Sequence, residues 1–374
     1  MSIIDHIILF AFLFALFFFI TRLPQKYINQ FFWQIMIFVI ITYSVITGCR
    51  YGWGNDYLWY KLRFENPEYY EDENIGFKIL NLTMNRVGLN YVGAFIIYSL
   101  IYITTAFVLI KDYKGNKFML ALFLPATLLQ NTFTIRQSVA HGFVFLAMHY
   151  LNKRKWEYVI LMTALAYTIH PAAILLIIPV IPLYLFVKKP IPLKYSIPIY
   201  IVTALSVDFF NAQITSTFSN YLPHLTLGNK FDNYLQNERW YNEDGVEEQF
   251  NQSTLTLILS MAFHIGILYL SYIALKYRPN KTVLCYYNTV VIGLISLRVF
   301  WNFEIFRRIV TPYTILYFIP LGYALYFYKF SIRNLGKRKS TCCKIALYSV
   351  LGYLILFYGR FILQSPNYIF FWNN

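Results

Sequence analysis

The chain has 374 residues, of which 58% are hydrophobic and 20% aromatic, whereas only 13% are charged. A typical soluble domain carries about 25% charged residues, so this composition excludes an ordinary soluble fold. A membrane-spanning helix needs about 20 apolar residues, and runs near that length recur along the whole chain. The composition therefore predicts a polytopic membrane protein and not two or three soluble domains.

Twelve apolar segments, each ended by polar, Pro or Gly residues, are predicted to form transmembrane helices. They cover residues 3–21, 31–48, 92–110, 118–133, 137–151, 156–169, 172–187, 195–212, 253–275, 282–300, 309–328 and 343–362. Two long connectors remain, at 49–91 and 213–252. The predicted fold class is an all-α integral membrane protein with about 12 transmembrane helices, forming a single polytopic membrane domain over residues 1–374.

The basic residues divide unevenly between the two faces of this arrangement. When the connectors are assigned to alternate faces, one face receives 20 of the 32 Lys and Arg residues but only two acids, Asp112 and Glu157. The positive-inside rule makes that face cytoplasmic. Both long connectors then become extracytoplasmic loops. The net charge of +15 therefore reflects topology, and no nucleic-acid partner is expected.

Nucleotide-driven and metal-dependent chemistry is not indicated by the sequence. A G-x-x-x-x-G-K-[ST] loop is absent, and no histidine pair has the spacing of a metal site. The cysteines, at 49, 285, 342 and 343, form no C-x-x-C pair. We expect neither a cofactor nor a metal.

Arginine is concentrated on the predicted outer face, where nine of the 12 basic residues are Arg. Lysine satisfies the positive-inside rule equally well, whereas the planar fork of Arg suits phosphate or carboxylate. Diphosphate-binding candidates near the outer helix ends are Arg50, Arg136, Arg307 and Arg308. Two interpretations stay open: these arginines reach toward lipid headgroups, or they bind an anionic ligand such as a lipid-linked phosphate.

Two short helices place Arg136 and His170 below the outer surface. The spans 118–133 and 156–169 measure roughly 24 Å and roughly 21 Å, against a hydrocarbon core near 30 Å. Polar groups at that depth must meet protein or water. We therefore expect a buried cavity at the outer end, with Gln137 beside Arg136.

The first long connector is rich in aromatic residues around an acid. Asp56 is followed by Tyr57, Trp59 and Tyr60. An aromatic belt at the membrane surface explains such a run, and so does a sugar site, in which rings stack on C–H faces while polar groups bind hydroxyls. Residues 76–89 are predicted to form an interfacial helix with Phe77 and Met84 on the apolar face and Asn81 on the polar one.

A second charged turn precedes the eleventh predicted span. Glu304, Arg307 and Arg308 lie within five residues of one another. Glu304 and Arg308 have the spacing of an ordinary helix-surface ion pair. The alternative is that they line the cavity, because an ion pair beside membrane spans is costly unless it faces protein or solvent.

Several stretches occur in the order and spacing of a known family. They are Gly54-Asn55-Asp56-Tyr57-Leu58-Trp59-Tyr60 followed by Gly76-Phe77-Lys78-Ile79-Leu80, Ile135-Arg136-Gln137-Ser138-Val139-Ala140, the basic turn Lys153-Arg154-Lys155, and Ala166-Tyr167-Thr168-Ile169-His170-Pro171-Ala172-Ala173. Lys230-Phe231-Asp232-Asn233-Tyr234-Leu235 and Arg308-Ile309 add weaker matches. Through them the chain resembles the EpsG/Wzy-type polymerases, bacterial membrane proteins that join lipid-linked repeat units of O-antigen, capsule or exopolysaccharide. Pro171 departs from the family pattern.

The resemblance implies a glycosyltransferase that polymerises undecaprenyl-diphosphate-linked oligosaccharide repeat units. The growing glycan would leave its carrier and pass to the next lipid-linked unit, on the outer face of the bacterial cytoplasmic membrane. A GT-C-like architecture with interfacial helices in the outer loops is expected. The expected partners are the lipid-linked oligosaccharide, membrane lipids, a chain-length regulator and a flippase.

Such a reaction needs an anion stabiliser and a base. Arg136 is assigned to the departing diphosphate, His170 to the base, and Asp56 to the acceptor sugar together with Tyr57, Trp59, Tyr60, Gln137 and Glu304. Alternatives to this assignment remain. Asp56 or Glu304 could be the base, and His170 could bind phosphate as a cation.

Two other functions compete with polymerisation. A multi-span glycosyltransferase that uses a lipid-monophosphate sugar would use Glu71-Asp72-Glu73 as its acidic element. A lipid-linked oligosaccharide flippase would carry charges along a central path, whereas here they crowd the outer rim.

Overall fold

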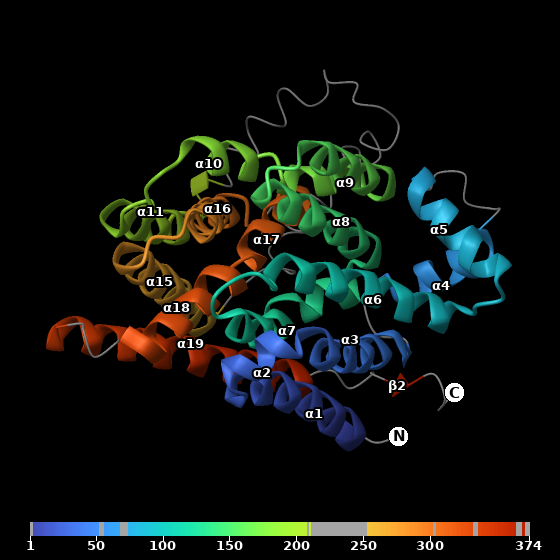
Figure 1. Cartoon of the computed structure of the whole chain (residues 1–374), viewed down its shortest axis with the longest axis horizontal. Coiled ribbons are helices and arrows are strands. Elements are labelled where there is room, and N and C mark those ends of the chain that lie inside the picture. Colours follow the sequence, from blue (N-terminus) through green and yellow to red (C-terminus); the bar gives the residue numbers. More distant parts are fainter. Residues whose placement is uncertain are drawn as a thin grey trace. The chain divides into compact units, whose positions relative to one another are not determined.

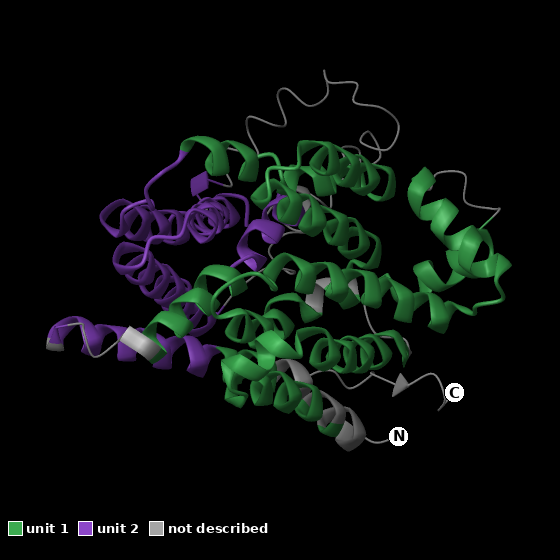
Figure 2. Ribbon diagram, in the orientation of Figure 1, with its two compact units in different colours: residues 1–186, 318–332, 354–374 green, residues 187–317, 333–353 purple. Residues whose placement is uncertain are grey.

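The computed structural model describes residues 3–51, 56–67, 74–207, 209–210, 253–301, 304–331, 336–363 and 369–370. The second long loop predicted at 213–252 and the acidic run 71–73 lie outside these residues. The described chain forms two units, residues 1–186, 318–332 and 354–374 in unit 1 and residues 187–317 and 333–353 in unit 2 (Figure 2). That these form one membrane domain stays a prediction.

Unit 1 consists of helices and one short strand pair (Figure 1). Its helices are α1 (Ile3–Arg22), α2 (Gln25–Gln30), α3 (Phe32–Gly48), α4 (Tyr57–Glu65), α5 (Ile75–Arg86), α6 (Tyr91–Ile110), α7 (Asn116–Phe133), α8 (Ile135–Asn152), α9 (Trp156–Ile169), the 3₁₀ helix η2 (Pro171–Leu176), α10 (Val180–Phe186) and α18 (Phe318–Ser331). Strands β1 (Arg50–Tyr51) and β2 (Ile369–Phe370) pair antiparallel, with Arg50 opposite Phe370.

Unit 2 contains α11 (Leu193–Leu205), α15 (Thr254–Tyr277), α16 (Lys281–Val299) and α17 (Glu304–Ile315), and α19 (Lys337–Leu363) contributes to both units. Helix α16 packs against α11, α15 and α17. The side chain of Asn288 on α16 accepts a hydrogen bond from the backbone N–H of Ile191 at 2.9 Å and donates one to the carbonyl of Lys189 at 3.3 Å. The connector before α11 is thereby fixed to α16.

The predicted helical class is confirmed. Within the described parts of the chain, five segments are long and apolar enough to cross a membrane: 91–110, 254–277, 281–299, 306–329 and 338–359. Shorter apolar helices occupy 11–22, 32–48, 116–128, 156–169, 171–186 and 193–205. Each of the twelve predicted segments overlaps a described helix, whereas the number of complete spans and the GT-C-like architecture stay predictions.

Helix α6 lies at the centre of unit 1, in contact with α3, α4, α7 and α8. Phe123 of α7 is fully buried, and its ring lies 5.8 Å from that of Tyr102 on α6 and 5.5 Å from that of Phe318 on α18. A Cβ on Gly48 would lie only 2.6 Å from the backbone nitrogen of Ile96, so the α3–α6 contact requires glycine. Lipid tails are as apolar as these side chains, so close packing holds such helices together.

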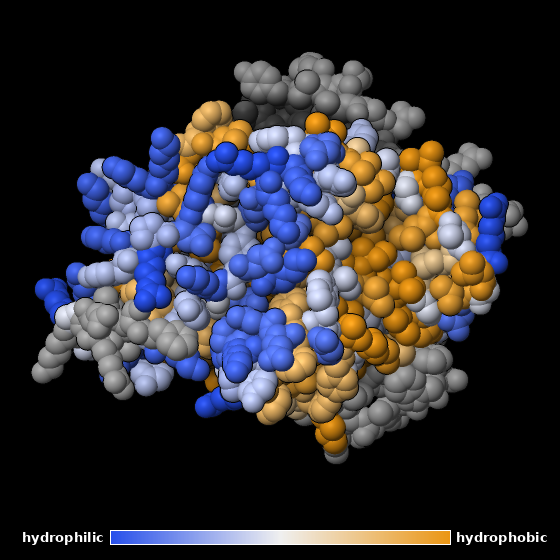
Figure 3. Space-filling model, viewed as in Figure 1, coloured by the Kyte–Doolittle hydropathy of each residue, from blue (hydrophilic) through white to orange (hydrophobic). Residues whose placement is uncertain are grey.

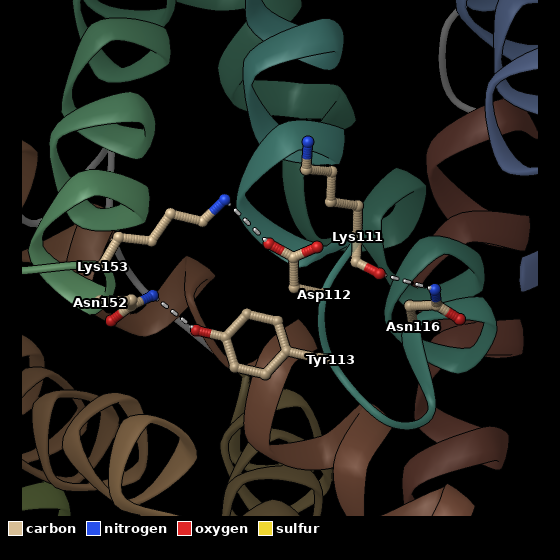
Figure 4. A network of polar contacts seen from close by, with 6 residues as sticks. All are labelled: Lys111, Asp112, Tyr113, Asn116, Asn152 and Lys153. Carbon is tan, nitrogen blue, oxygen red and sulfur yellow. Dashed lines mark hydrogen bonds and ion pairs between the residues drawn. The ribbon is translucent and has the colours of Figure 1, made fainter.

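Polar contacts link the predicted cytoplasmic connectors of unit 1, and Figure 4 shows those between the connectors that follow α6 and α8. Lys153 after α8 lies 3.4 Å from the carboxylate of Asp112 after α6, and Asn152 donates to the hydroxyl of Tyr113 at 2.7 Å. Lys117 reaches the carbonyl of Leu23 after α1, at 2.6 Å. These three connectors therefore lie close together in unit 1, while their placement on the cytoplasmic face of a membrane stays a prediction.

The helix predicted at 76–89 exists as α5, but its orientation differs from the prediction. Phe77 and Met84 are buried as expected. Asn81, assigned to the polar face, is also buried and accepts a hydrogen bond from the hydroxyl of Tyr98 on α6. A buried amide must find such a partner, and α6 supplies one that sequence periodicity does not reveal. Ile75 and Ile79 face outward instead.

The turn between α8 and α9 contains a strained residue. Arg154 has a φ of 57°, a left-handed conformation that favours glycine. The backbone N–H of Lys155 donates to the carbonyl of Tyr150, and that of Arg154 to Leu151, both at 3.0 Å. These bonds define a Schellman motif with Arg154 at the position that is usually Gly.

We expect Arg154→Gly to stabilise the protein by about 1 kcal/mol, raising the midpoint of thermal unfolding in detergent by roughly 2–4 °C. The matched control is Lys155→Gly, which removes the same charge where φ is −96° and should give no gain. An equal rise in both variants would show that charge, and not backbone strain, is responsible.

Candidate functional site

Helix α4 is fixed to unit 1 by one buried face. Tyr57, Tyr60 and Phe64 are buried along it, and the ring of Tyr57 packs edge-on against that of Phe95 on α6 at 5.4 Å. Tyr60 packs against Phe77 of α5 at 6.1 Å. Tyr57 and Tyr60 therefore hold α4 in place, and their expected contact with sugar stays a prediction.

Trp59 projects from the same helix and lies next to two cationic side chains. Its indole is 37% exposed. The guanidinium carbon of Arg63, one turn further along α4, lies 3.3 Å from the ring centroid, and that of Arg136 on α8 lies 5.6 Å from it. The negative face of an indole attracts such groups. Trp59 thus brings together arginines that are 73 residues apart in the sequence.

Arg136 retains the capacity to bind a ligand. It is the second residue of α8 and is half-buried. Its Nε atom is buried and has no hydrogen-bond partner among the described residues, an arrangement that costs free energy unless a ligand or water supplies an acceptor. A phosphate charge about 4 Å from a guanidinium gains about 4 kcal/mol at an effective dielectric constant near 20. This cluster of Trp59, Arg63 and Arg136 is suited to an anion.

Arg50 has a different environment from Arg136. It is buried, with its guanidinium 5.2 Å from the ring of Phe95. It donates to the backbone carbonyl of Thr47, and at 3.2 Å to that of Thr132. These carbonyls belong to the last turns of α3 and α7, where helices leave acceptors unsatisfied. Arg50 therefore joins two helix ends, and its binding of diphosphate stays a prediction.

His170 lies between two helices in an extended conformation, with φ −153° and ψ 103°. Its N–H caps α9 by donating to Ala166 at 2.9 Å, and its carbonyl accepts from Ala173 at 2.9 Å. Pro171 explains this backbone, since a residue before proline is extended and proline fits the first position of a helix. The departure from the family pattern is therefore compatible with a well-defined position for His170.

Helices α8 and α9 are packed antiparallel neighbours, so the start of α8 and the end of α9 lie at the same end of the pair. Arg136 and His170 occupy those positions. His141, buried one turn after Gln137 on α8, lies within electrostatic range of His170. Gln137 itself is nearly buried. The structure thus brings Arg136 and His170 to the same end of unit 1, as the short spans predicted.

The end of α9 is also held by α5. Asn74, the residue before α5, donates from Nδ2 to the carbonyl of Ile169 at 3.0 Å. A Cβ on Gly76 would lie 2.4 Å from the Oγ1 of Thr168 and 2.9 Å from its backbone carbonyl carbon. Only glycine permits this approach, so the start of α5 fixes the backbone on which His170 lies.

The remaining predicted site residues are Arg307, Arg308 and Glu304 in unit 2 and Asp56 in unit 1. Arg307 lies 5.9 Å from the ring of Trp301, and Arg308 is exposed. The backbone of Glu304 begins α17, but its side chain lies outside the described residues. Asp56 precedes α4 and is half-buried, without capping the helix through its side chain.

Sequence reasoning overlooked Arg63, for which the signal is its i, i+4 spacing from Trp59. Arg298 in the last turn of α16 is buried and donates to the Ser260 hydroxyl at 2.6 Å and the Tyr200 hydroxyl at 3.3 Å. Only tertiary structure could distinguish Arg298 from the exposed outer arginines.

Among the described residues, no group of three or more His, Cys, Asp or Glu is placed to hold a metal ion.

Residues 33–373 match the EpsG family. The chain belongs to the EpsG family. No curated protein and no solved structure matches it. The match covers nearly the whole chain, so the predicted family is confirmed. Membership and the apolar helices identify this EpsG-family protein as a multi-pass membrane protein of polysaccharide biosynthesis with a polymerase-type role.

We expect Gly76→Ala to move α5 away from α9 and to destabilise the protein by about 1–3 kcal/mol, the usual cost of overpacking. Thermal unfolding in detergent measures the effect. Gly352→Ala is the control, because no atom lies within 4 Å of its added Cβ. Adding Thr168→Ala should recover part of the loss. Equal unfolding midpoints for Gly76→Ala and wild type would contradict the close approach.

Proposed function

We propose that this protein polymerises undecaprenyl-diphosphate-linked oligosaccharide repeat units by transferring the growing glycan to the next lipid-linked unit. The arrangement of Arg63 and Arg136 around Trp59 is the observation that supports this most directly. Two guanidinium groups near one ring repel each other and are stabilised by a multivalent anion. A diphosphate on a lipid carrier provides that charge at a membrane surface.

In the proposed reaction, the acceptor hydroxyl attacks the anomeric carbon of the donor glycan. A carbon–oxygen bond forms to the acceptor, and the bond between the anomeric carbon and the diphosphate oxygen breaks. The departing diphosphate gains negative charge in the transition state, and Arg136 and Arg63 are positioned to stabilise it. The acceptor proton passes to a base. Arg307 and Arg308 are proposed as further diphosphate contacts.

His170 is the proposed base, and Asp56 positions the acceptor sugar. The location of His170 at the same end of unit 1 as Arg136 supports this assignment, because base and leaving group must serve one substrate. An imidazole exchanges protons near neutral pH. Trp59, with its exposed ring, is the proposed stacking surface for sugar.

The proposed location is the bacterial cytoplasmic membrane, with the site facing outward. The positive-inside rule supports this orientation, because the connectors joined in Figure 4 carry Lys111 and Lys153. A flippase that delivers the lipid-linked unit and a chain-length regulator are the proposed partners. O-antigen, capsule or exopolysaccharide would be the product.

Incubation of purified protein with synthetic undecaprenyl-diphosphate repeat units should give a ladder of products.

Arg136→Lys should lower kcat/KM by roughly 10- to 100-fold, since a hydrogen bond to a charged group contributes about 1.5–3 kcal/mol. Lysine cannot reproduce the planar fork. The control is Arg86→Lys in the exposed last turn of α5. Wild-type rates for Arg136→Lys would refute its role, and absence of any ladder would refute polymerisation.

Single-turnover transfer across pH tests the base. We expect the wild-type rate to fall in acid, where imidazole is protonated, and His170→Gln to lose this dependence together with about 10²–10⁴ in rate. Asp56→Asn should mainly raise KM. If His170→Gln keeps both its rate and its pH profile while Asp56→Asn loses transfer, the two roles are reversed.

A further inference from the structure

Helices α4 and α5 present apolar side chains to the outside. Leu58 and Leu62 on α4, and Ile75 and Ile79 on α5, are each between 50% and 66% exposed. They are spaced four residues apart, so each pair lies on one face of its helix. We call these four residues the α4–α5 apolar surface. Figure 3 shows hydrophobic side chains in this part of unit 1, with hydrophilic side chains at their edge.

The opposite faces of both helices are already occupied by unit 1. Tyr57 and Phe64 on α4, and Phe77 and Asn81 on α5, are buried. The two helices contact each other, and Asn85 of α5 donates to the carbonyl of Phe64 at 3.2 Å. The α4–α5 apolar surface therefore remains outward while the inner faces are fixed.

The α4 part of this surface adjoins the cationic cluster. Leu62 adjoins Arg63 in the sequence and follows Trp59 by three residues, about 4.5 Å along the helix axis. The other flank of Leu62 on α4 carries Lys61 and Glu65, whose charged groups lie 4.0 Å apart. Leu58 and Leu62 thus form an apolar stripe on α4. The ion pair of Lys61 and Glu65 flanks it on one side, and Trp59 with Arg63 flanks it on the other. A ligand that matches both features has an anionic head and a long apolar chain.

We propose that the α4–α5 apolar surface binds the polyprenyl chain of the lipid carrier, whose diphosphate lies at Trp59, Arg63 and Arg136. This proposal rests on the proposed function. A chain attached to a diphosphate at Trp59 must leave the cluster along an apolar path, and Leu62 is the adjacent exposed apolar side chain on α4. The surface directs the polyprenyl chain into the outer leaflet and thereby orients the diphosphate and the glycan attached to it.

Bulk lipid competes for the same surface. Lipid tails are as apolar as leucine, so transfer of a polyprenyl chain from bilayer to protein gains little by hydrophobicity alone. Selectivity must come from the attached diphosphate, which holds the chain beside α4. The polyprenyl carrier should therefore be enriched at Leu62 and Ile79 only while the cationic cluster is intact.

Photocrosslinking tests this without requiring turnover. A photoreactive residue replaces Leu62 or Ile79 in the full chain, and the protein is reconstituted into phosphatidylethanolamine–phosphatidylglycerol vesicles that contain a small fraction of undecaprenyl diphosphate. The matched control is position Ile37 on α3, an apolar side chain that is 53% exposed in the same unit. Mass spectrometry identifies each adduct.

We expect undecaprenyl adducts at 62 and 79 about tenfold above the carrier's share of the lipids, equivalent to about 1.4 kcal/mol of preference, and phospholipid adducts at 37. Trp59→Leu together with Arg63→Gln should abolish the enrichment.

Phospholipid adducts in proportion to their share of the bilayer at all three positions, or crosslinks between two copies of the chain, would overturn the proposal. A product ladder accompanied by phospholipid adducts alone would refute this surface and leave polymerisation standing, whereas enriched carrier adducts without a ladder would refute polymerisation and leave the surface standing.

Discussion

Inside a bilayer, every backbone N–H and C=O must be paired within the protein, and this constraint accounts for several polar side chains near the candidate site of unit 1. Helices satisfy it along their length, but each helix end leaves carbonyls or amides without partners. The ends of α3 and α7 are paired by Arg50, and the end of α9 by Asn74. Polar side chains are therefore gathered at helix ends, where a reaction can use them.

The same constraint gives different functions to arginines that look alike in the sequence. Arg50 donates to backbone carbonyls from a buried position, whereas Arg136 keeps a buried Nε without a hydrogen-bond partner among the described residues and faces the indole of Trp59. The first arginine completes the fold, and the second remains able to bind an anion. Arg298 of unit 2 resembles the first, because it is buried and donates to two hydroxyl groups.

Helices α4 and α5 connect the anion cluster to the proposed base. Helix α4 carries Trp59 and Arg63, and α5 contacts both α4 and the end of α9 that precedes His170. The inner faces of the two helices are anchored by aromatic rings and a buried amide. Such anchoring limits the movement of cluster and base relative to each other, as a site that acts on one substrate requires.

The sequence alone determined the helical segments and the family, and it predicts the grouping of the connectors on two faces. These properties depend on local hydrophobic runs, on short motifs and on the count of basic residues, all of which are linear along the chain. The predicted depth of Arg136 and His170 likewise rests on helix length, because a helix rises by a fixed distance per residue. In the same way, the spacing of Trp59 and Arg63 was present in the sequence, although it was overlooked.

Only the tertiary structure decided which side chains of one type face the core and which face outward. Tyr57 and Tyr60 are buried whereas Trp59 is exposed, and Asn81 is buried whereas Ile79 is not. Hydropathy predicts the opposite burial for Asn81 and Ile79, because it does not register that the distant hydroxyl of Tyr98 pairs with the buried amide. The meeting of Arg136 with Trp59 likewise required α8 to pack close to α4. Burial depends on partners from remote parts of the chain, and these partners are fixed only when the helices pack together.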